Sequence, residues 1–340
     1  MTVRLGVLGT GAIGKDHIER ITNRLSGALI TSVYDINRET AENAVQTFHL
    51  EAKIFEDDND LIYSNDVDAI LICSRNDAHL APILKAIEAG KPVFTEKPMT
   101  TTAEESYQVV QAEIAKQKRF IQVGFMRRFD PGYQALKKIV ESGRIGKPLL
   151  GNCRHFCAQP PTSYFETVNV VNDAFIHEID ILHYLFNENY KSIEMKFSRE
   201  NSTNPNENLR DPHLAIVEME SGALVTVELN MNSHYGYDIQ CRIVGELGTA
   251  SLPEVSGCEL RLEGERIYPL HKDWSLRFVK AYDNEIQSFI EQVEKGASPN
   301  GPTAWDGYIA SVTSDAAIRS LNNQEKVQIE LKETPELYLK

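Results

Sequence analysis

A glycine-rich turn between two apolar segments constrains the fold of this chain more than any other feature. Residues 3–8 are mostly apolar, the pattern G-x-G-x-x-G follows at residues 9–14, and a second apolar segment, residues 29–34, ends at Asp35. A strand, a glycine turn, a helix and a second strand in this order predict the first unit of a doubly wound α/β domain. An isolated glycine triplet would indicate no more than a turn, but here the strand, the helix and the acidic residue that give it meaning are all present.

The spacing of the glycines predicts how a dinucleotide would bind. Gly9 permits the tight turn, Gly11 lets a pyrophosphate approach the backbone, and Gly14 lets the helix pack closely on the strand. The helix that begins at this turn directs free N–H groups and the positive end of its dipole at the phosphates. The predicted phosphate-binding residues are Gly9, Gly11, Ala12, Ile13 and Gly14.

Asp35 predicts which dinucleotide binds. It follows the glycine turn by about 20 residues, where a carboxylate accepts hydrogen bonds from the ribose hydroxyls of the adenosine. The same carboxylate would repel a 2′-phosphate, so the sequence favours NAD over NADP. The nearby Arg38 is included in the predicted cofactor site.

Composition and charge restrict the class of protein and its partners. The chain has 340 residues, of which 42% are hydrophobic and 25% charged, which suits a globular protein of two domains. Its net charge of −14 makes nucleic acid and anionic membrane surfaces unfavourable partners. No apolar run reaches the roughly 18 residues of a membrane span, and the first strand leaves no room for a signal peptide. The 5 cysteines are scattered along the sequence, a distribution typical of reduced thiols in a cytoplasmic protein. Cys153 and Cys157 have no second pair of ligands at zinc spacing nearby, so no metal site is predicted.

Alternating strand-like and helix-like segments continue to about residue 124 and predict a parallel sheet covered on both faces. We therefore expect a Rossmann dinucleotide-binding domain over residues 1–124, with its ligands at the carboxyl ends of the strands. The expected strands are residues 3–8, 29–34, 67–73, 92–95 and 120–124, and the expected later helices are residues 78–89 and 103–118.

Beyond residue 125 the pattern changes to strand-like runs separated by short turns. This pattern predicts an α+β domain with a large, mostly antiparallel open sheet over residues 125–340. The expected strands are residues 192–198, 213–220, 223–232, 238–245, 249–253 and 258–263. The expected helices lie near residues 132–142, 172–186, 278–293 and 305–320.

Lys97 is the first candidate for chemistry. It lies between Glu96 and Pro98, at the carboxyl end of an expected parallel strand, where a ligand should meet the sheet. A lysine there can donate a hydrogen bond to a substrate oxygen and stabilise negative charge that develops on it. A surface lysine at the end of a strand is the simpler alternative.

A second candidate group lies on the expected helix near residues 172–186. Asp173 and His177 are spaced i, i+4, and Asp180 continues the same face. A carboxylate one turn before a histidine can orient the imidazole and raise its basicity, as a general base requires. A surface ion pair is the alternative, whereas the zinc pattern H-E-x-x-H fails because residue 181 is Ile181.

Other polar residues lie where a cofactor or a substrate could contact them. Arg127 follows the last strand of the first domain, and Tyr235 lies in a turn between two expected strands. His79 lies near the start of a helix, where it could contact the cofactor or serve only the local structure.

Four motifs together resemble the glucose–fructose oxidoreductase/inositol dehydrogenase/rhizopine-catabolism family, over nearly the whole chain. Residues 235–241 and 301–308 are most similar to the inositol dehydrogenases within it. The four motifs are residues 9–14, 96–98, 124–128 and 173–180.

The resemblance implies an NAD-dependent oxidation of a ring hydroxyl of myo- or scyllo-inositol to 2-keto-inositol, in a homotetramer assembled through the open sheets. It implies that Lys97, Asp173 and His177 are the catalytic residues. The implied substrate-binding residues are Lys97, Arg127, Asp173, His177 and Tyr235, and the implied further cofactor-binding residues are Ser74, Arg75, His79, Glu96 and Lys97.

Two alternatives remain open from the sequence. The chain could oxidise another polyol or an aldose, as other members of the family do. Within the inositols, Arg75 stands where relatives of the myo-inositol type tend to carry a tryptophan and small residues, which leaves the preferred isomer open. A cofactor-sensing regulatory protein on the same fold is the second alternative, but such a protein has no need of the lysine and the Asp–His pair together.

Overall fold

The computed structural model describes residues 2–160, 165–204, 206–253 and 259–339. The chain divides into two compact units. Unit 1 consists of Met1–Met126, Tyr282–Ser311 and Lys332–Lys340, and unit 2 of Arg127–Ala281 and Val312–Leu331. The division expected at residue 124 differs from this one, because it assigns both late segments of unit 1 to the second domain.

Unit 1 is built on a sheet of six parallel strands in the order β3-β2-β1-β4-β5-β6. This is the strand order of a dinucleotide-binding Rossmann fold, and it confirms the predicted fold class. The strands are β1 (Val3–Leu8), β2 (Ala28–Tyr34), β3 (Lys53–Ile54), β4 (Ala69–Ile72), β5 (Val93–Thr95) and β6 (Ile121–Val123).

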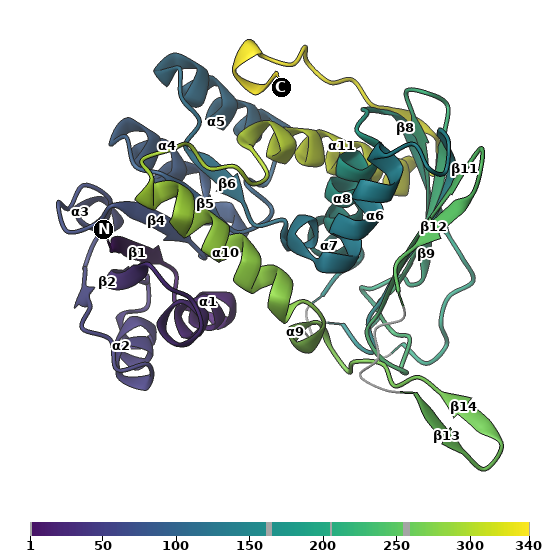
Figure 1. Ribbon diagram of the computed structural model, residues 1–340, viewed down its shortest axis with the longest axis horizontal. Coiled ribbons are helices and arrows are strands. Elements are labelled where there is room, and N and C mark those ends of the chain that lie inside the picture. The colour runs from purple at the N-terminus through teal and green to yellow at the C-terminus, as the bar shows by residue number, and fades with distance from the viewer. Residues whose placement is uncertain (1, 161–164, 205, 254–258, 340) are drawn as a thin grey trace. The chain divides into compact units, whose positions relative to one another are not determined.

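Helices pack on both faces of this sheet (Figure 1). One face is covered by α1 (Ala12–Asn23), α2 (Arg38–Thr47) and α10 (Val279–Glu294), whose apolar residues join one buried cluster with those of β1, β2, β4 and β5. The remaining helices are α3 (Asp58–Ile62), α4 (Leu80–Glu88), α5 (Ala103–Lys116) and α11 (Ala304–Asn323). Of the helices that the structure describes, none is long and apolar enough to cross a membrane.

The late segment of the chain belongs to unit 1 because it completes this core. Ile286 and Phe289 of α10 are fully buried in the cluster, and the Phe289 ring meets the Phe94 ring edge-on at 6.0 Å between centroids. The side-chain amide of Gln122 on β6 donates to the backbone oxygen of Glu285 at 3.0 Å. Residues from both ends of the sequence are therefore needed to fill one hydrophobic core.

Unit 2 contains a sheet of seven strands in the order β12-β11-β7-β10-β9-β8-β15. Only the β7–β10 pair is parallel, so the sheet is mostly antiparallel, as predicted. The strands are β7 (Pro148–Phe156), β8 (Tyr190–Phe197), β9 (His213–Met219), β10 (Leu224–Asn230), β11 (Asp238–Gly245), β12 (Thr249–Ser251) and β15 (Val327–Gln328).

The helices of unit 2 lie on one face of this sheet (Figure 1). Residues along β9 and β10 alternate between buried and either partly or fully exposed, which is the pattern of a sheet with one face packed and the other more open. These helices are α6 (Pro131–Glu141), α7 (Thr167–Asn169), α8 (Ile176–Phe186) and α9 (Trp274–Arg277).

The expected helix near residues 172–186 is interrupted. A π-helical segment over Val170–Phe175 precedes α8, so Asp173 lies in the π-helical turn and His177 in the first turn of the α-helix. Single π-helical turns are uncommon and occur frequently at functional sites.

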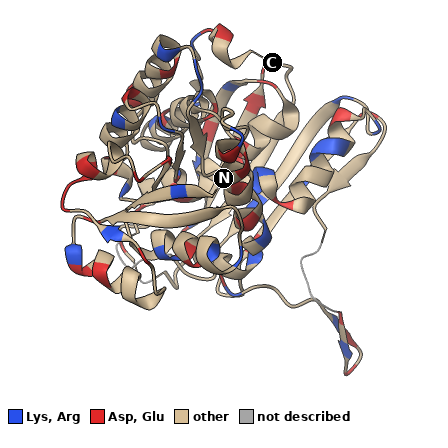
Figure 2. Ribbon diagram, turned by 60° about the vertical axis from the view of Figure 1, so that its left-hand side comes forward, with Lys and Arg blue, Asp and Glu red and all other residues tan. Residues whose placement is uncertain are grey.

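A two-stranded hairpin replaces the last strand that we expected in the sheet. β13 (Leu260–Leu262) and β14 (Glu265–Ile267) pair only with each other. The first residue of the expected strand, Cys258, lies outside the described residues. The hairpin projects from the rest of unit 2 in both views and carries both signs of charge, at the lower right of Figure 2.

Candidate functional site

The glycine turn of unit 1 has the geometry that a bound pyrophosphate requires. Gly9 has a φ of +93°, and a Cβ there would lie 2.6 Å from the backbone nitrogen of Ser74. A Cβ on Gly14 would lie 2.2 Å from the oxygen of Gly9, so helix and strand could not approach as closely. Gly11 caps the N-terminus of α1, and a Cβ there would meet nothing within 4 Å. The open space at Gly11 lies where the helix directs its free N–H groups, so this turn fits a dinucleotide.

Asp35 follows β2, and both of its carboxylate oxygens are already held. Oδ2 accepts from the backbone nitrogen of Thr10 at 2.7 Å and from its hydroxyl at 3.1 Å, and Oδ1 accepts from the Asn37 nitrogen at 2.9 Å. A carboxylate oxygen can accept more than one hydrogen bond, so Asp35 keeps capacity for a ribose hydroxyl. These bonds fix the carboxylate beside the glycine turn, and its contact with a ribose stays a prediction.

Arg38 is engaged by two carboxylates. Its Nε donates to Glu42 at 2.8 Å, and its guanidinium also forms an ion pair with Glu56. In this arrangement its positive charge is balanced by protein groups, and its predicted contact with a cofactor stays a prediction.

The segments after β4 and β5 are joined by His79. Its imidazole is completely buried, with Nδ1 2.9 Å from the Pro98 oxygen and Nε2 3.1 Å from the Ser74 oxygen. Burial lowers the pKa of His79. Arg75, in contrast, is 86% exposed and pairs with Asp77 at 2.9 Å. The structure thus gives His79 a structural role, while the cofactor contacts of Ser74, Arg75 and His79 stay predictions.

Lys97 lies beside a buried carboxylate at the carboxyl end of β5. The Glu96 side chain accepts the Lys97 backbone N–H at 3.1 Å through Oε2, and its Oε1 lies 2.7 Å from Nε2 of His17. Burial alone would raise the pKa of Glu96, but the hydrogen bond with His17, together with Lys97, lowers it. The sequence predicted Glu96 and Lys97 here, but not His17.

In unit 2, His177 neighbours a buried ionic group. The His177 side chain is 7% exposed, and its ring centroid lies 6.3 Å from that of His155 on β7. Asp173 is half-buried in the π-helical turn. The predicted contact between Asp173 and His177 stays a prediction.

The buried ionic group consists of Glu178, Arg127 and His155. Glu178 pairs with the Arg127 guanidinium, and its Oε2 lies 3.0 Å from Nδ1 of His155. Both side chains of the Glu178–Arg127 pair are 1% exposed. Burial would raise the pKa of Glu178, but Arg127 and His155 lower it. Arg127 therefore has a defined protein partner, and its direct contact with substrate stays a prediction.

Asp180 serves a second ion pair. Its carboxylate accepts from Arg128 at 2.6 Å and is 1% exposed. This pair ties α8 to the segment that precedes α6, so Asp180 has a structural partner of its own.

Tyr235 belongs to a polar network at the end of β11. Its hydroxyl donates to Oδ2 of Asp238 at 2.8 Å, and Asp238 also accepts from Arg154 at 3.3 Å and from Gln240 at 2.9 Å. Burial and the Asp238 carboxylate raise the pKa of the Tyr235 phenol to about 12, so it remains a hydrogen-bond donor at neutral pH.

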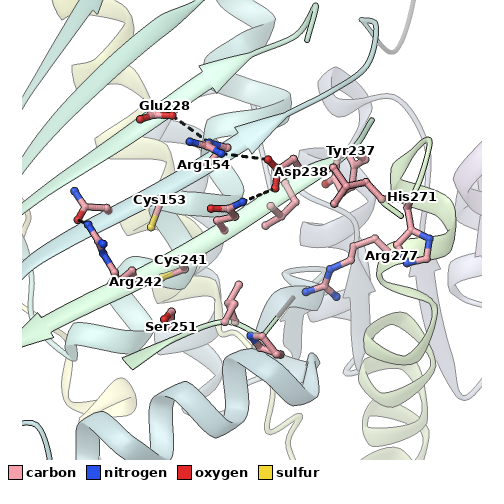
Figure 3. A pocket seen from close by; sticks show the side chains of 16 residues that line it. Cys153, Arg154, Glu228, Tyr237, Asp238, Cys241, Arg242, Ser251, His271 and Arg277 are labelled. Atoms are coloured by element: carbon pink, nitrogen blue, oxygen red, sulfur yellow. Dashed lines mark hydrogen bonds and ion pairs between the residues drawn. The ribbon is translucent and has the colours of Figure 1, made fainter. Parts of the chain in front are cut away.

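A cavity of about 410 Å³ lies beside this network (Figure 3). Arg154 and Asp238 line it from the sheet, with His271 and Arg277 on its other side, and Arg277 is paired with Asp130 at 2.9 Å. Among the described residues, none of the site residues predicted from the sequence lines this cavity.

The sequence analysis missed His17, His155 and Glu178. One feature of the sequence could have identified His17. It lies three residues after Gly14 and therefore shares the helix face that packs on the sheet. Glu178 directly follows His177, but a neighbour in the sequence lies on another face of a helix, so adjacency carried no information on contact. His155 lies on β7, which the sequence analysis did not predict.

Comparison with known proteins covers both units. Residues 3–125 match the oxidoreductase family, NAD-binding Rossmann fold, and residues 137–329 match the C-terminal alpha/beta domain of the same family. The chain is 44% identical over 338 residues to an inositol 2-dehydrogenase/D-chiro-inositol 3-dehydrogenase of Halalkalibacterium halodurans, covering 99% of this chain and 97% of the relative. It is also 44% identical to an inositol 2-dehydrogenase of Klebsiella pneumoniae, covering 99% of both chains.

A solved structure is similar over the full length. The crystal structure of myo-inositol dehydrogenase from Lactobacillus casei, in complex with NAD(H) and myo-inositol, matches with a TM-score of 0.97 and 41% identity, covering 100% of both chains.

Proposed function

Because the chain belongs to the glucose–fructose oxidoreductase/inositol dehydrogenase/rhizopine-catabolism family of NAD-binding oxidoreductases, we propose that it is an inositol 2-dehydrogenase. The observation that carries this proposal is the similarity to inositol dehydrogenases over the whole chain, both units included. The proposed reaction is oxidation of a ring hydroxyl of myo- or scyllo-inositol to 2-keto-inositol.

Three side chains perform the proposed chemistry. His177 takes the proton of the hydroxyl that is oxidised, and Asp173 orients its imidazole. Lys97 donates a hydrogen bond to the same oxygen and stabilises the negative charge that develops there. NAD, when bound, supplies the acceptor for the hydride. The buried Glu178 carboxylate supports this assignment, because it fixes the residues around the first turn of α8.

A panel of substrates tests the proposal. NADH absorbance is followed after mixing the enzyme and NAD with myo-inositol, scyllo-inositol, D-chiro-inositol, other polyols and aldoses. We expect turnover with an inositol that exceeds turnover with every aldose. A preference for another polyol or an aldose would replace this proposal. No turnover with any of them would favour the cofactor-sensing alternative.

We predict that Asp35 makes the protein prefer NAD over NADP. Asp35→Ser should narrow the preference for NAD, because it removes the negative charge that opposes a 2′-phosphate. It should not reverse the preference, because Glu42 and Glu56 still occupy Arg38. Adding Glu42→Gln and Glu56→Gln should release Arg38 and raise NADP affinity further. Titration of each cofactor checks this, and equal use of NAD and NADP by the wild type would contradict it.

We also propose a homotetramer in the cytoplasm. One face of the seven-stranded sheet lacks helices in Figure 1, and the hairpin exposes Leu260 (48%) and Leu262 (56%). Large exposed apolar surfaces are uncommon on soluble monomers, so a second copy of the chain is the proposed cover. Cys73, Cys153, Cys157 and Cys241 are free thiols, which suits a reducing compartment.

A further inference from the structure

A chain of hydrogen bonds runs from helix α1 to Lys97 inside unit 1. The Arg20 guanidinium lies 3.0 Å from Nδ1 of His17, Nε2 of His17 lies 2.7 Å from Glu96, and Glu96 accepts the Lys97 backbone N–H at 3.1 Å. The side chains of Arg20 and His17 are 2% and 0% exposed, and Glu96 is 6% exposed. Water therefore does not compete for these contacts.

The direction of this chain is fixed by Arg20. A guanidinium can only donate hydrogen bonds, so Nδ1 of His17 must accept and carries no proton. Nε2 of His17 must then carry the proton and donate a hydrogen bond to Glu96. Arg20 does not depend on His17 for charge balance, because it pairs with Asp16 at 2.8 Å and with Asp283 at 2.9 Å. His17 is therefore a neutral imidazole in a single tautomer.

Packing holds both partners in place. The His17 ring meets the Phe94 ring edge-on at 5.6 Å and the Tyr282 ring at 5.9 Å. On the other side of Glu96, a Cβ on Gly124 would lie 3.2 Å from the carboxyl carbon, so this carboxylate has little room to rotate. A buried carboxylate that loses a donor is costly, so His17 is the group that keeps Glu96 ionised and oriented.

We infer that His17 is a positioning residue for Lys97, because it holds the Glu96 carboxylate that binds the Lys97 backbone. The role of Lys97 rests on the proposed function. Helix α1 carries both His17 and the glycine turn at its N-terminus, so the phosphate-binding helix and Lys97 are joined through one rigid hydrogen-bonded path. Burial would raise the pKa of Glu96, and His17 is the first group that lowers it. The titratable and charged groups that interact with Glu96 are His17 of α1, Cys73 after β4, His79 before α4, and Lys97. Arg20 of α1 contacts His17 on the side away from Glu96.

The tautomer can be tested without a substrate. Nitrogen NMR of the full-length protein labelled in histidine, with His17→Gln to assign the signal, reports the protonation of each ring nitrogen. We expect His17 to be protonated at Nε2 only, with and without NAD. A doubly protonated His17, or one protonated at Nδ1, would overturn the inference whether or not the chain oxidises inositol.

The positioning role is tested by two variants and a pH profile. His17→Gln keeps an amide that can donate to Glu96, whereas His17→Phe removes the donor. Without the donor, Glu96 takes up a proton at a higher pH. Turnover of His17→Phe should therefore fall roughly tenfold per pH unit below the raised pKa of Glu96, and should recover at alkaline pH. His17→Gln should retain most of the wild-type profile. His213→Phe, which removes another buried imidazole that has no proposed role, is the matched control and should leave the profile unchanged.

Two outcomes would overturn this part. If His17→Phe matches the wild type at every pH, His17 does not position Lys97. If both His17 variants lose the same fraction of turnover at every pH, the role of His17 is only structural. An inactive wild type would instead refute the proposed function, and the NMR result would still decide the tautomer and the hydrogen bond to Glu96.

Discussion

Two buried carboxylates each lie next to a residue to which we assign chemistry. Glu96 precedes Lys97, and Glu178 follows His177. Each is ionised because donors surround it, His17 and the Lys97 backbone for Glu96, and Arg127 and His155 for Glu178. An ionised carboxylate without such donors would be strongly unfavourable in the interior. At the scale of the residue, these buried contacts anchor the chain segments that carry Lys97 and His177.

His177→Ala should lower turnover by roughly 10²–10⁴-fold, because it removes the proposed general base. NAD affinity should change little. Asp173→Asn should cost less, since the imidazole remains and only its orienting charge is lost. The double variant should be little worse than His177→Ala, because both residues act on one proton transfer. Polyol oxidation by variants of verified fold measures this, and near-wild-type turnover of His177→Ala would move the base elsewhere, with Lys97 the next candidate.

Glu178→Gln should destabilise the protein by about 3–5 kcal/mol at neutral pH, because it leaves the buried Arg127 charge unbalanced. The folded pKa of Glu178 is lowered, so its contribution is present above the ordinary glutamate pKa of about 4.3 and is lost as pH falls through the lowered value. The difference from the wild type should therefore shrink in acid. Denaturant unfolding measures it, with Glu141→Gln on the surface as control, and equal losses for the two variants would refute this account.

The sequence could single out Lys97 and His177 as candidates because their positions follow from simple periodicity, at the end of a parallel strand and on a helix. Their partners could not be found in this way. The contact between His155 and Glu178 joins strand β7 to helix α8, and the contact between His17 and Glu96 joins helix α1 to the segment after β5. Such contacts depend on tertiary packing, which local patterns do not encode.

At the scale of the element, two glycines at the start of α1 have different roles. Gly11 leaves open space and Gly14 allows close packing. Gly11→Ala should weaken NAD binding by roughly tenfold or more, about 1.4 kcal/mol, because its Cβ would occupy the space left for phosphate, while stability stays unchanged. Gly14→Ala should lower stability by about 1–3 kcal/mol as well, because its Cβ meets the Gly9 backbone. Binding titrations and thermal melts measure both effects. If Gly11→Ala bound NAD as the wild type does, the phosphates would lie elsewhere.

The elements differ in how well the sequence predicted them. The helices α10 and α11 and all strands of unit 1 except β3 follow the expected positions, because their apolar patterns are long or are bounded by glycine. The two-residue strand β3 was not predicted. Strand β7 was missed because Gly151 and Asn152 interrupt its apolar pattern, although its neighbours β10 and β11 supply pairing on both sides. The π-helical turn before α8 was also missed. Its side chains follow the spacing of an α-helix, so the sequence carries no sign of the different backbone hydrogen bonding.

At the scale of the whole molecule, the exposed hairpin makes assembly a measurable property. Its strands pair Leu260 with Ile267 and Leu262 with Glu265, so three large apolar side chains share one face. Light scattering at micromolar concentration should report a tetramer, and the double variant Leu260→Ser and Leu262→Ser should reduce the assembled fraction. Leu29→Ser, at a leucine that is 61% exposed in unit 1, is the control. A monomeric wild type would contradict the proposal.

The chain passes between its units after residues 126, 281, 311 and 331, and this has a consequence for synthesis. All six strands of the parallel sheet leave the ribosome while Ile286, Phe289 and Ile290 of α10 are still untranslated. The first unit cannot close its core at that stage, and its nascent sheet must wait exposed for more than a hundred further residues, at translation rates of roughly 5–20 residues per second. A protein truncated after β6 would therefore have an incomplete core and be prone to aggregation. A circular permutation that joins α10 directly to β1 would instead bring the two parts of that core together in the nascent chain.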